Sequence, residues 1–138
     1  MSKIFRIGDV YLINFSGIDH EQCGIRPGVV FQNNTGNIYS PNIIALPLTS
    51  SVKKLNDELP THVKVYSDDS GLIKDSVVLC ENPVIVSKNR CRNFLTTLPM
   101  KYMREIAIAN LIATSALSFI EPDGIFDLIQ KCVSLNSI

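Results

Sequence analysis

The stretch DVYLINF at residues 9–15 decides the fold. Its β-branched and aromatic side chains favour a pleated, half-buried strand. Two further short apolar runs follow it, PGVVFQ at residues 27–32 and NIIALPLT at residues 42–49. Polar segments with Gly and Asn separate these runs, and both residue types favour turns. The first third of the chain therefore predicts a sheet of short strands.

The same pattern continues through the middle of the chain. Residues 61–65 (THVKV) alternate polar and apolar side chains, which is typical of a strand with one buried face. We expect further strands at residues 76–80 and 84–86. Pro47 cannot donate a ladder hydrogen bond, so its end of the strand should lie at a sheet edge or a bulge. Polar loops or turns are expected at residues 16–25, 33–37, 50–60 and 68–71. Short strands with frequent turns predict a small barrel or sandwich, and not a fold of alternating strands and helices.

The pattern changes at Pro99, a residue that suits the first position of a helix. We predict one helix over residues 99–118, because the polar residues Asn110, Thr114 and Ser118 recur every four residues as a narrow stripe. Apolar side chains cover most of the remaining helix surface, and such a helix is buried on more than one side. Packing on the strands explains one side, and a dimer interface would explain the other.

A short second helix is expected at residues 124–132, after a break at Pro122-Asp123-Gly124. The prediction is one mainly β (α+β) domain over residues 1–138. Within it, residues 1–98 are mostly strands and loops, and residues 119–138 are a C-terminal extension.

The composition excludes several classes of protein. Hydrophobic residues make up 46% and charged residues 19% of the 138-residue chain, which excludes a disordered or collagen-like protein. No apolar run is long enough to span a bilayer, and no apolar stretch follows the first residues as in a secretory signal. We therefore expect a cytoplasmic protein without membrane contact. The 13 basic and 13 acidic residues cancel, so a nucleic-acid site must be a local patch, such as Lys53 and Lys54.

The cysteines and histidines indicate no metal centre. Cys23, Cys80, Cys91 and Cys132 form no CxxC motif and no Cys/His pair at zinc spacing. In a cytoplasmic chain we expect reduced thiols. Cys23 lies in a polar, Gly-flanked loop, where an exposed thiol could react. We predict neither a metal nor another cofactor.

Polar side chains gather in the loops at the expected strand ends, which a small barrel can bring together at one rim. RNA carries its own nucleophile, the 2′-hydroxyl. An enzyme that cuts RNA therefore needs a base, an acid and donors to the phosphate. Arg26 offers a planar fork and Thr49 a hydroxyl for the phosphate, while His20 or Glu81 could exchange the protons. The catalytic candidates are therefore Arg26, Thr49, His20 and Glu81.

A set of short segments carries a more specific signal. The segments are Ile7-Gly8-Asp9-Val10-Tyr11, Glu21-Gln22-Cys23-Gly24-Ile25-Arg26-Pro27, Gln32-Asn33, Gly36-Asn37, Ser40-Pro41, Leu48-Thr49-Ser50, Leu59-Pro60-Thr61-His62-Val63 and Asp75-Ser76-Val77. In this order and spacing they resemble the MazF/PemK family of toxins, which are sequence-specific mRNA endoribonucleases of bacterial toxin–antitoxin systems. The resemblance runs from about residue 6 to residue 118.

The resemblance implies a fold, a reaction and partners. The fold is an SH3-like, PemK/CcdB-type antiparallel β-barrel with a C-terminal helix, which forms a homodimer. The reaction is metal-independent cleavage of single-stranded mRNA, leaving a 2′,3′-cyclic phosphate and a 5′-hydroxyl and inhibiting growth. Arg26 and Thr49 fall on catalytic positions of the family, and His20 and Glu81 match groups of some plasmid-borne members. The implied protein partner is a MazE-like antitoxin, whose acidic tail would cover the RNA groove.

Other polar residues are candidates for contact with the RNA. The two adjacent lysines could steer phosphates, and the Asn side chains near residue 35 could read splayed bases. The RNA-binding candidates are Glu21, Gln22, Asn33, Asn34, Asn37, Ser50, Lys53, Lys54 and Asn82.

Two other functions stay open at this point. The related CcdB toxins share the barrel but act on DNA gyrase through a C-terminal Trp, and this chain has no Trp. A catalytically inactive, RNA-binding member is the other alternative. Many members carry an Arg two residues after the last Glu-Gln motif, whereas here Glu81-Asn82 is followed by Pro83-Val84.

Overall fold

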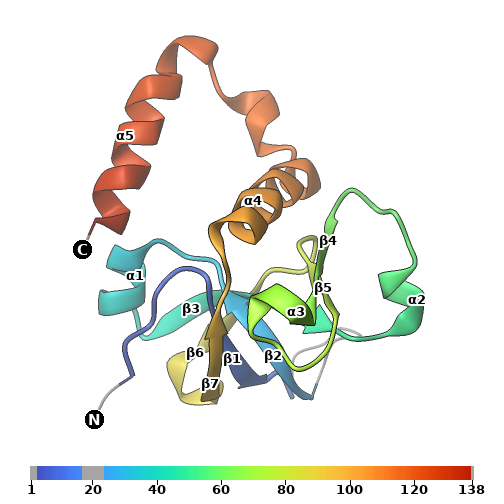
Figure 1. Cartoon of the computed structure of the whole chain (residues 1–138). Coiled ribbons are helices and arrows are strands. Elements are labelled where there is room, and N and C mark those ends of the chain that lie inside the picture. The colour runs from blue at the N-terminus through green and yellow to red at the C-terminus, as the bar shows by residue number, and fades with distance from the viewer. Residues whose placement is uncertain (1–2, 17–23, 138) are drawn as a thin grey trace.

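The computed structural model describes residues 3–16 and 24–137, and Figure 1 shows the course of the chain. In this part of the chain the strands are β1 (Asp9–Asn14), β2 (Ile25–Val30), β3 (Asn42–Thr49), β4 (His62–Val65), β5 (Ser76–Leu79), β6 (Val84–Ser87) and β7 (Cys91–Thr97). The α-helices are α1 (Asn34–Tyr39), α2 (Val52–Leu55), α3 (Ser67–Ser70), α4 (Met100–Thr114) and α5 (Ile125–Asn136). Short 3₁₀ turns are η1 (Lys88–Arg90), η2 (Ala116–Phe119) and η3 (Pro122–Gly124).

All strand pairs are antiparallel, in the order β4-β5-β3-β2-β1-β7, with β6 also beside β3. Strand β3 is the centre of this arrangement. One of its edges pairs with β2, and the other pairs first with β6 and then, from Leu48, with β5. Pro47 lies between these two pairings, where no partner on that edge needs its missing N–H. The expected sheet edge or bulge at Pro47 is therefore not what the structure shows, because β3 is a central strand and Pro47 falls in the gap between its β6 and β5 pairings.

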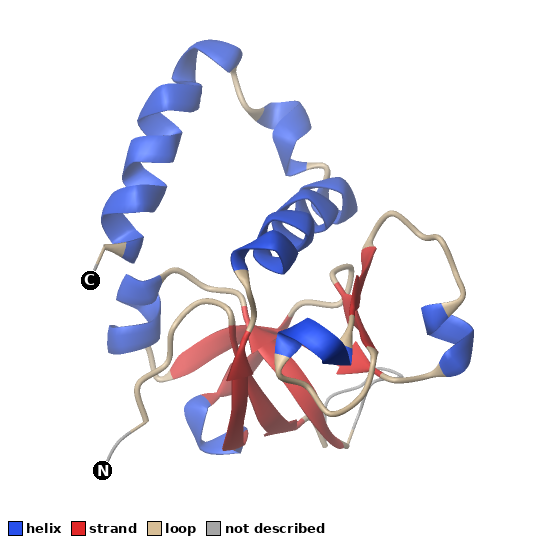
Figure 2. Ribbon diagram, viewed as in Figure 1, coloured by secondary structure: helices blue, strands red, loops and turns tan. Residues whose placement is uncertain are grey.

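The predicted antiparallel β architecture and the long C-terminal helix are confirmed, but the sheet is not a closed barrel. In the described residues no pairing joins β4 to β7 at the two ends of the sheet. Helix α4 covers the sheet near β4 instead (Figure 2). Val63 and Val65 of β4 share one buried cluster with Tyr102 and Ile106 of α4, so helix packing takes the place of strand closure.

Several element boundaries differ from the expectations. Strand β7 was not expected, because its residues Cys91–Thr97 are mostly exposed and polar, as in an edge strand that pairs only with β1. The expected turn at residues 33–37 is the start of helix α1, whose first N–H groups are capped by Asn33. The loops expected at residues 50–60 and 68–71 contain the short helices α2 and α3.

Helix α4 is shorter than predicted and buried on one side only. It ends at Thr114, because Ser115 adopts a left-handed conformation (φ 55°). Its buried residues are Tyr102, Ile106 and Ala109, which share one face. The expected second buried face is exposed in this chain, and the second helix, α5, runs four residues beyond its predicted end at residue 132.

Two buried clusters lie on the two faces of the sheet, because successive side chains of a strand point to opposite faces. Val10 and Leu46 belong to the cluster under α4, whereas Tyr11 and Ala45, their neighbours in sequence, belong to the other cluster. None of the described helices is long and apolar enough to cross a membrane.

Candidate active site

The ends of β2 and β3 bring two of the four predicted catalytic residues together. These strands pair with Gly28 opposite Pro47 and Val29 opposite Leu46. Continued by two residues, the same antiparallel register places Arg26 opposite Thr49. Side chains at directly opposite positions lie about 5 Å apart at their Cβ atoms. Both residues are partly exposed, so a ligand can reach them.

Close packing beneath Arg26 supports this position. Arg26 lies opposite the fully buried Ile13 of β1, and its Nε atom is buried. Two residues on, a Cβ added to Gly28 would lie 2.8 Å from Cδ1 of Ile13 and 3.1 Å from Cζ of Phe15. A larger residue here would have to displace the tips of these two side chains, so Gly28 lets them pack closely against β2 next to Arg26.

The hydroxyl of Thr49 is oriented by its neighbour. Its Oγ1 accepts a hydrogen bond from the backbone N–H of Ser51, 3.2 Å away, which leaves the hydroxyl proton for another acceptor. Thr49 and Ser50 also line a hollow of about 470 Å³, together with Pro27, Leu48 and Lys74. Thr49 therefore stands beside a space that a small ligand group can enter, whereas Arg26 does not line it.

Arg90 holds the start of the connection between β1 and β2. Its Nη1 donates to the carbonyl of Asn14 at 3.1 Å and to that of Ser16 at 2.6 Å. The N–H of Phe15 donates to the carbonyl of Gly24 at 2.7 Å, which closes the far side of this connection two residues before Arg26. Sequence reasoning missed Arg90, because its carbonyl partners lie 76 and 74 residues earlier in the chain and leave no local signal.

Glu81, the third candidate, does not join Arg26 and Thr49. Strands β3 and β5 are antiparallel with Thr49 opposite Val77, so Glu81 lies four residues further, roughly 13 Å along the sheet. The expectation that three strand ends meet at one rim is wrong for this pair within one chain. Neighbouring antiparallel strands run in opposite directions, so the C-terminal ends of β3 and β5 lie at opposite ends of their pairing.

Glu81 instead binds His62, as part of a charged cluster with Asp57. The Nε2 of His62 lies 2.7 Å from Oε2 of Glu81, and its Nδ1 lies 3.0 Å from both carboxylate oxygens of Asp57. The His62 side chain is only 2% exposed. Desolvation alone would raise the pKa of Asp57, but hydrogen bonds from His62 and from the Leu59 N–H, with nearby positive charge, lower it below its usual range.

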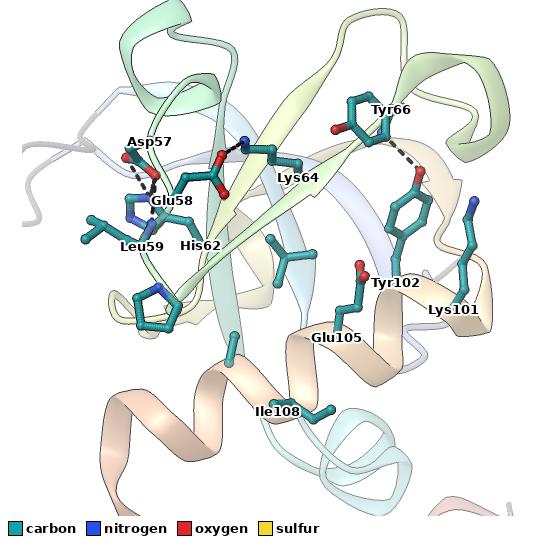
Figure 3. A pocket seen from close by; sticks show the side chains of 13 residues that line it. Asp57, Glu58, Leu59, His62, Lys64, Tyr66, Lys101, Tyr102, Glu105 and Ile108 are labelled. Carbon is teal, nitrogen blue, oxygen red and sulfur yellow. Dashed lines mark hydrogen bonds and ion pairs between the residues drawn. The ribbon is translucent and has the colours of Figure 1, made fainter.

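This cluster forms one end of a groove between β4 and α4 with a volume of about 600 Å³ (Figure 3). His62 lies on the alternating strand β4, and its ring is enclosed between two carboxylates. Further along the groove, Lys64 pairs with Glu58 at 3.1 Å, and the Tyr102 hydroxyl accepts from the N–H of Tyr66 at 3.1 Å. Charges of both signs pair with one another here, so the groove offers no uniform field for RNA.

The three asparagines near residue 35 are structural. Asn34 and Asn37 are buried (8% and 1% exposed), and the Asn34 side chain accepts from the Ile7 N–H at 2.8 Å and from the Asn37 amide at 3.1 Å. Asn33 caps helix α1 through the Gly36 N–H at 2.8 Å. The buried, hydrogen-bonded amides of Asn34 and Asn37 cannot turn outward to read bases, so the expectation that they do so is wrong. Asn33 is exposed and stays a candidate.

The remaining candidates lie apart from one another. Lys53 and Lys54 stand in the last turn of α2, which begins three residues after Thr49. Asn82 lies in the turn after β5, next to Glu81, where its N–H donates to the Leu79 carbonyl at 3.1 Å. Three further candidates lie outside the described residues, namely His20, Glu21 and Gln22.

The thiols and acidic groups show no metal centre. In residues 3–16 and 24–137, no three His, Cys, Asp or Glu side chains come together to hold a metal ion. Burial raises the pKa of Cys80 to about 12 and that of Cys91 to about 11, so both thiols are protonated at neutral pH. Cys132 is exposed on α5, and Cys23 lies outside the described residues.

Comparison with known proteins places these features in context. Residues 6–112 match the family of PemK-like, MazF-like toxins of type II toxin–antitoxin systems. An endoribonuclease MazF of Staphylococcus saprophyticus is 43% identical over 104 residues, which cover 75% of this chain and 85% of the relative.

Solved structures share the fold at low sequence identity. MazF of Deinococcus radiodurans superposes with a TM-score of 0.69 at 20% identity, covering 83% of this chain and 99% of that one. An endoribonuclease from a mycobacterial species, solved in complex with its cognate antitoxin, has a TM-score of 0.67 at 22% identity, covering 80% and 95%. The C-terminal extension after residue 112 lies outside the family match.

Proposed function

The chain belongs to the family of PemK-like, MazF-like toxins of type II toxin–antitoxin systems and is an endoribonuclease, and we propose that it cuts single-stranded mRNA at the paired ends of β2 and β3. One observation carries this choice of site. The β2–β3 register, continued two residues past Gly28 and Pro47, puts Arg26 opposite Thr49, and Thr49 lines a hollow of about 470 Å³.

The proposed reaction uses the 2′-hydroxyl of the RNA as nucleophile. A base removes the 2′ proton, the 2′ oxygen forms a bond to phosphorus, and the bond from phosphorus to the 5′ oxygen breaks. The departing 5′ oxygen takes a proton from an acid. The products are a 2′,3′-cyclic phosphate and a 5′-hydroxyl, and the balance needs neither water nor an oxidant in this step.

Arg26 and Thr49 serve the phosphate in this proposal. As the oxygens around phosphorus gain charge, the guanidinium of Arg26 can donate two parallel hydrogen bonds to them. Thr49 adds its free hydroxyl proton as a further donor. The side chains of Ile13 and Phe15 pack closely at Gly28, two residues from Arg26, and so support this part of β2.

His20 is the proposed proton carrier, on the resemblance to members that have a His at this point. Glu81 hydrogen-bonds to His62 and stands roughly 13 Å from Thr49 along the sheet. Glu81 therefore enters the reaction only if a second protomer brings it to the phosphate. The proposed contacts along the RNA are Glu21, Gln22, Ser50, Lys53, Lys54, Asn82 and the exposed Asn33.

The proposed partners follow from the family. A mycobacterial endoribonuclease of this fold was solved in complex with its cognate antitoxin, and so was MazF of Deinococcus radiodurans with MazE. We infer a MazE-like antitoxin for this chain as well. We also infer a homodimer, since the exposed apolar face of α4 needs a cover, and a cytoplasmic location, where mRNA is found.

The test is cleavage of a long mixed-sequence RNA in EDTA, with the cut ends mapped by primer extension. We expect discrete cuts that bear 5′-hydroxyls. Arg26→Lys keeps the charge but loses the fork, and should slow cutting about 100-fold or more, as the loss of a transition-state donor does. Thr49→Val removes only the hydroxyl and should slow cutting about tenfold or more.

Arg92→Lys is the matched control, because Arg92 is exposed on β7, away from the proposed site. This variant should cut RNA at the wild-type rate. Wild-type cutting by Arg26→Lys would refute the site. A folded wild-type protein that binds RNA in EDTA and leaves it intact would instead be an inactive RNA-binding member. Inhibition of DNA gyrase in a supercoiling assay would favour a protein target.

A further inference from the structure

The C-terminal arm, residues 115–137, carries an apolar helix whose side chains the rest of the described chain leaves largely exposed. Helix α5 has no buried residue among those described. Its Phe126 is 79% exposed, Ile129 49% and Val133 57%, and these three residues share one helix face. A helix of 12 residues is marginal in water unless an apolar face packs against something. A covering surface is therefore required.

The arm is held at its far end. The Asn34 N–H donates to Oδ1 of Asn136 at 2.9 Å, and the Thr35 hydroxyl donates to the Leu135 carbonyl at 3.0 Å. These bonds dock the end of α5 on α1, to the left of α4 in Figure 1. The left-handed turn at Ser115 and the turns η2 and η3 lead the chain away from α4. With its end anchored on α1, the arm leaves the outer face of its own α4 exposed.

The outer face of α4 is a matching apolar surface. Ile108 is 61% exposed, Leu111 39% and Ile112 49%, at helix positions that lie side by side. Together with Leu117 they line a hollow of about 420 Å³. Each chain therefore presents both an apolar hollow and an uncovered apolar helix.

We propose that the arm joins two copies of this chain, with α5 of each protomer packed on the outer face of α4 of the other. Under two-fold symmetry, α5 of each protomer fills the α4 hollow of the other. Both apolar helices and both hollows are then buried. The proposal rests on the homodimer inferred above, and it adds the residues beyond the family match as the part that holds the dimer together.

The exposed area fits a second copy better than a small ligand. Ten large apolar side chains on α4, η2 and α5 are 39–86% exposed, namely Ile108, Leu111, Ile112, Leu117, Phe119, Phe126, Leu128, Ile129, Val133 and Leu135. At about 200 Å² for a large side chain, they offer on the order of 1,000 Å² per protomer, compared with about 800 Å² per partner in a stable interface. Helix α5 adds few charges that would have to be desolvated, namely Asp127 and Lys131.

The test is cross-linking between two differently tagged versions of the full chain, both carrying Cys23→Ser. One version keeps Cys132 on α5 as its exposed thiol, and the other carries Ile112→Cys on α4 together with Cys132→Ser. After mixing and re-equilibration, a short bismaleimide should join the two versions within the dimer. Ile85→Cys replaces Ile112→Cys in the control, because Ile85 is equally accessible (70% exposed) but lies on β6, and it should give no product.

Sedimentation equilibrium supplies the second readout. Ile129→Asp should weaken dimerisation tenfold or more, whereas Ser134→Asp, on the polar side of α5, should leave it unchanged. A wild-type chain that sediments as a monomer at tens of micromolar overturns the homodimer itself. A dimer that gives no cross-link from Cys132 to residue 112, or that tolerates Ile129→Asp, overturns the exchange of arms and leaves the homodimer standing. RNA cleavage, measured separately, decides the proposed reaction independently of both.

Discussion

Replacing Ile106 with Ala should destabilise the protein far more than the same change at Ile108, two residues along the same helix. Ile106 is 0% exposed and packs with Val63, Val65 and Tyr102 in the cluster between α4 and the sheet. Ile108 is 61% exposed on the outer face. The two substitutions remove the same atoms and change helix propensity equally, so their difference measures burial alone.

The size of the effect follows from the buried volume. Removing three carbon atoms from a fully buried side chain loses about 2–3 kcal/mol of transfer free energy. The cavity that remains brings the total for Ile106→Ala to about 3–4 kcal/mol, and the better helix propensity of Ala returns about 0.4 kcal/mol. The net loss of about 3 kcal/mol lowers Tm by about 10–15 °C for a chain of this size.

The assay is thermal unfolding by circular dichroism at two protein concentrations. Ile106→Ala should lower Tm by the same amount at both, because its contacts lie within one chain. Ile108→Ala should lower Tm by at most about 2 °C at low concentration, and by more at high concentration if α4 contacts a second copy. Equal losses for the two variants at low concentration would refute the assignment of the faces of α4.

Two further predictions concern Arg90, which binds the start of the β1–β2 connection, and the loss of stability at acidic pH. Arg90→Ala should slow RNA cleavage about tenfold or more through kcat, because the guanidinium positions the connection that leads to Arg26. Arg90→Lys should have an intermediate effect, and RNA binding should change little in both variants. A change in binding alone would contradict this role. Hydrogen bonds from Lys101 and the Tyr102 hydroxyl lower the pKa of Asp69 below its usual 3.8. A lowered folded-state pKa adds stability that is full above the unfolded value and lost as pH falls through the folded one. The Tm difference between wild type and Asp69→Asn should therefore be constant near neutral pH and shrink below about pH 4, and a difference that persists at lower pH would count against the ion pair.

Much of the fold and part of the site could be predicted from the sequence. Strand β3 (Asn42–Thr49) has the predicted boundaries, and β1, β4 and β5 each differ from their predicted bounds by a single residue at one end. Local side-chain type is sufficient here, because β-branched and alternating residues favour an extended chain wherever they pair. The edge strand β7 was not predicted, because its exposed and polar residues do not show the β-branched or alternating pattern.

By itself the sequence determined the short strands of this protein, its C-terminal helices and its family, because these depend on residue types in order along the chain. Only the tertiary structure decided which strand ends meet. The register of β2 with β3, extended by two residues, puts Arg26 opposite Thr49. The antiparallel register of β3 with β5 separates Glu81 from Thr49, and Glu81 hydrogen-bonds to His62 instead. Pairing partners lie far apart in sequence, and their choice depends on which faces the whole core can bury. Which candidate site residues lie near one another is therefore decided by the packed molecule and not by any one segment.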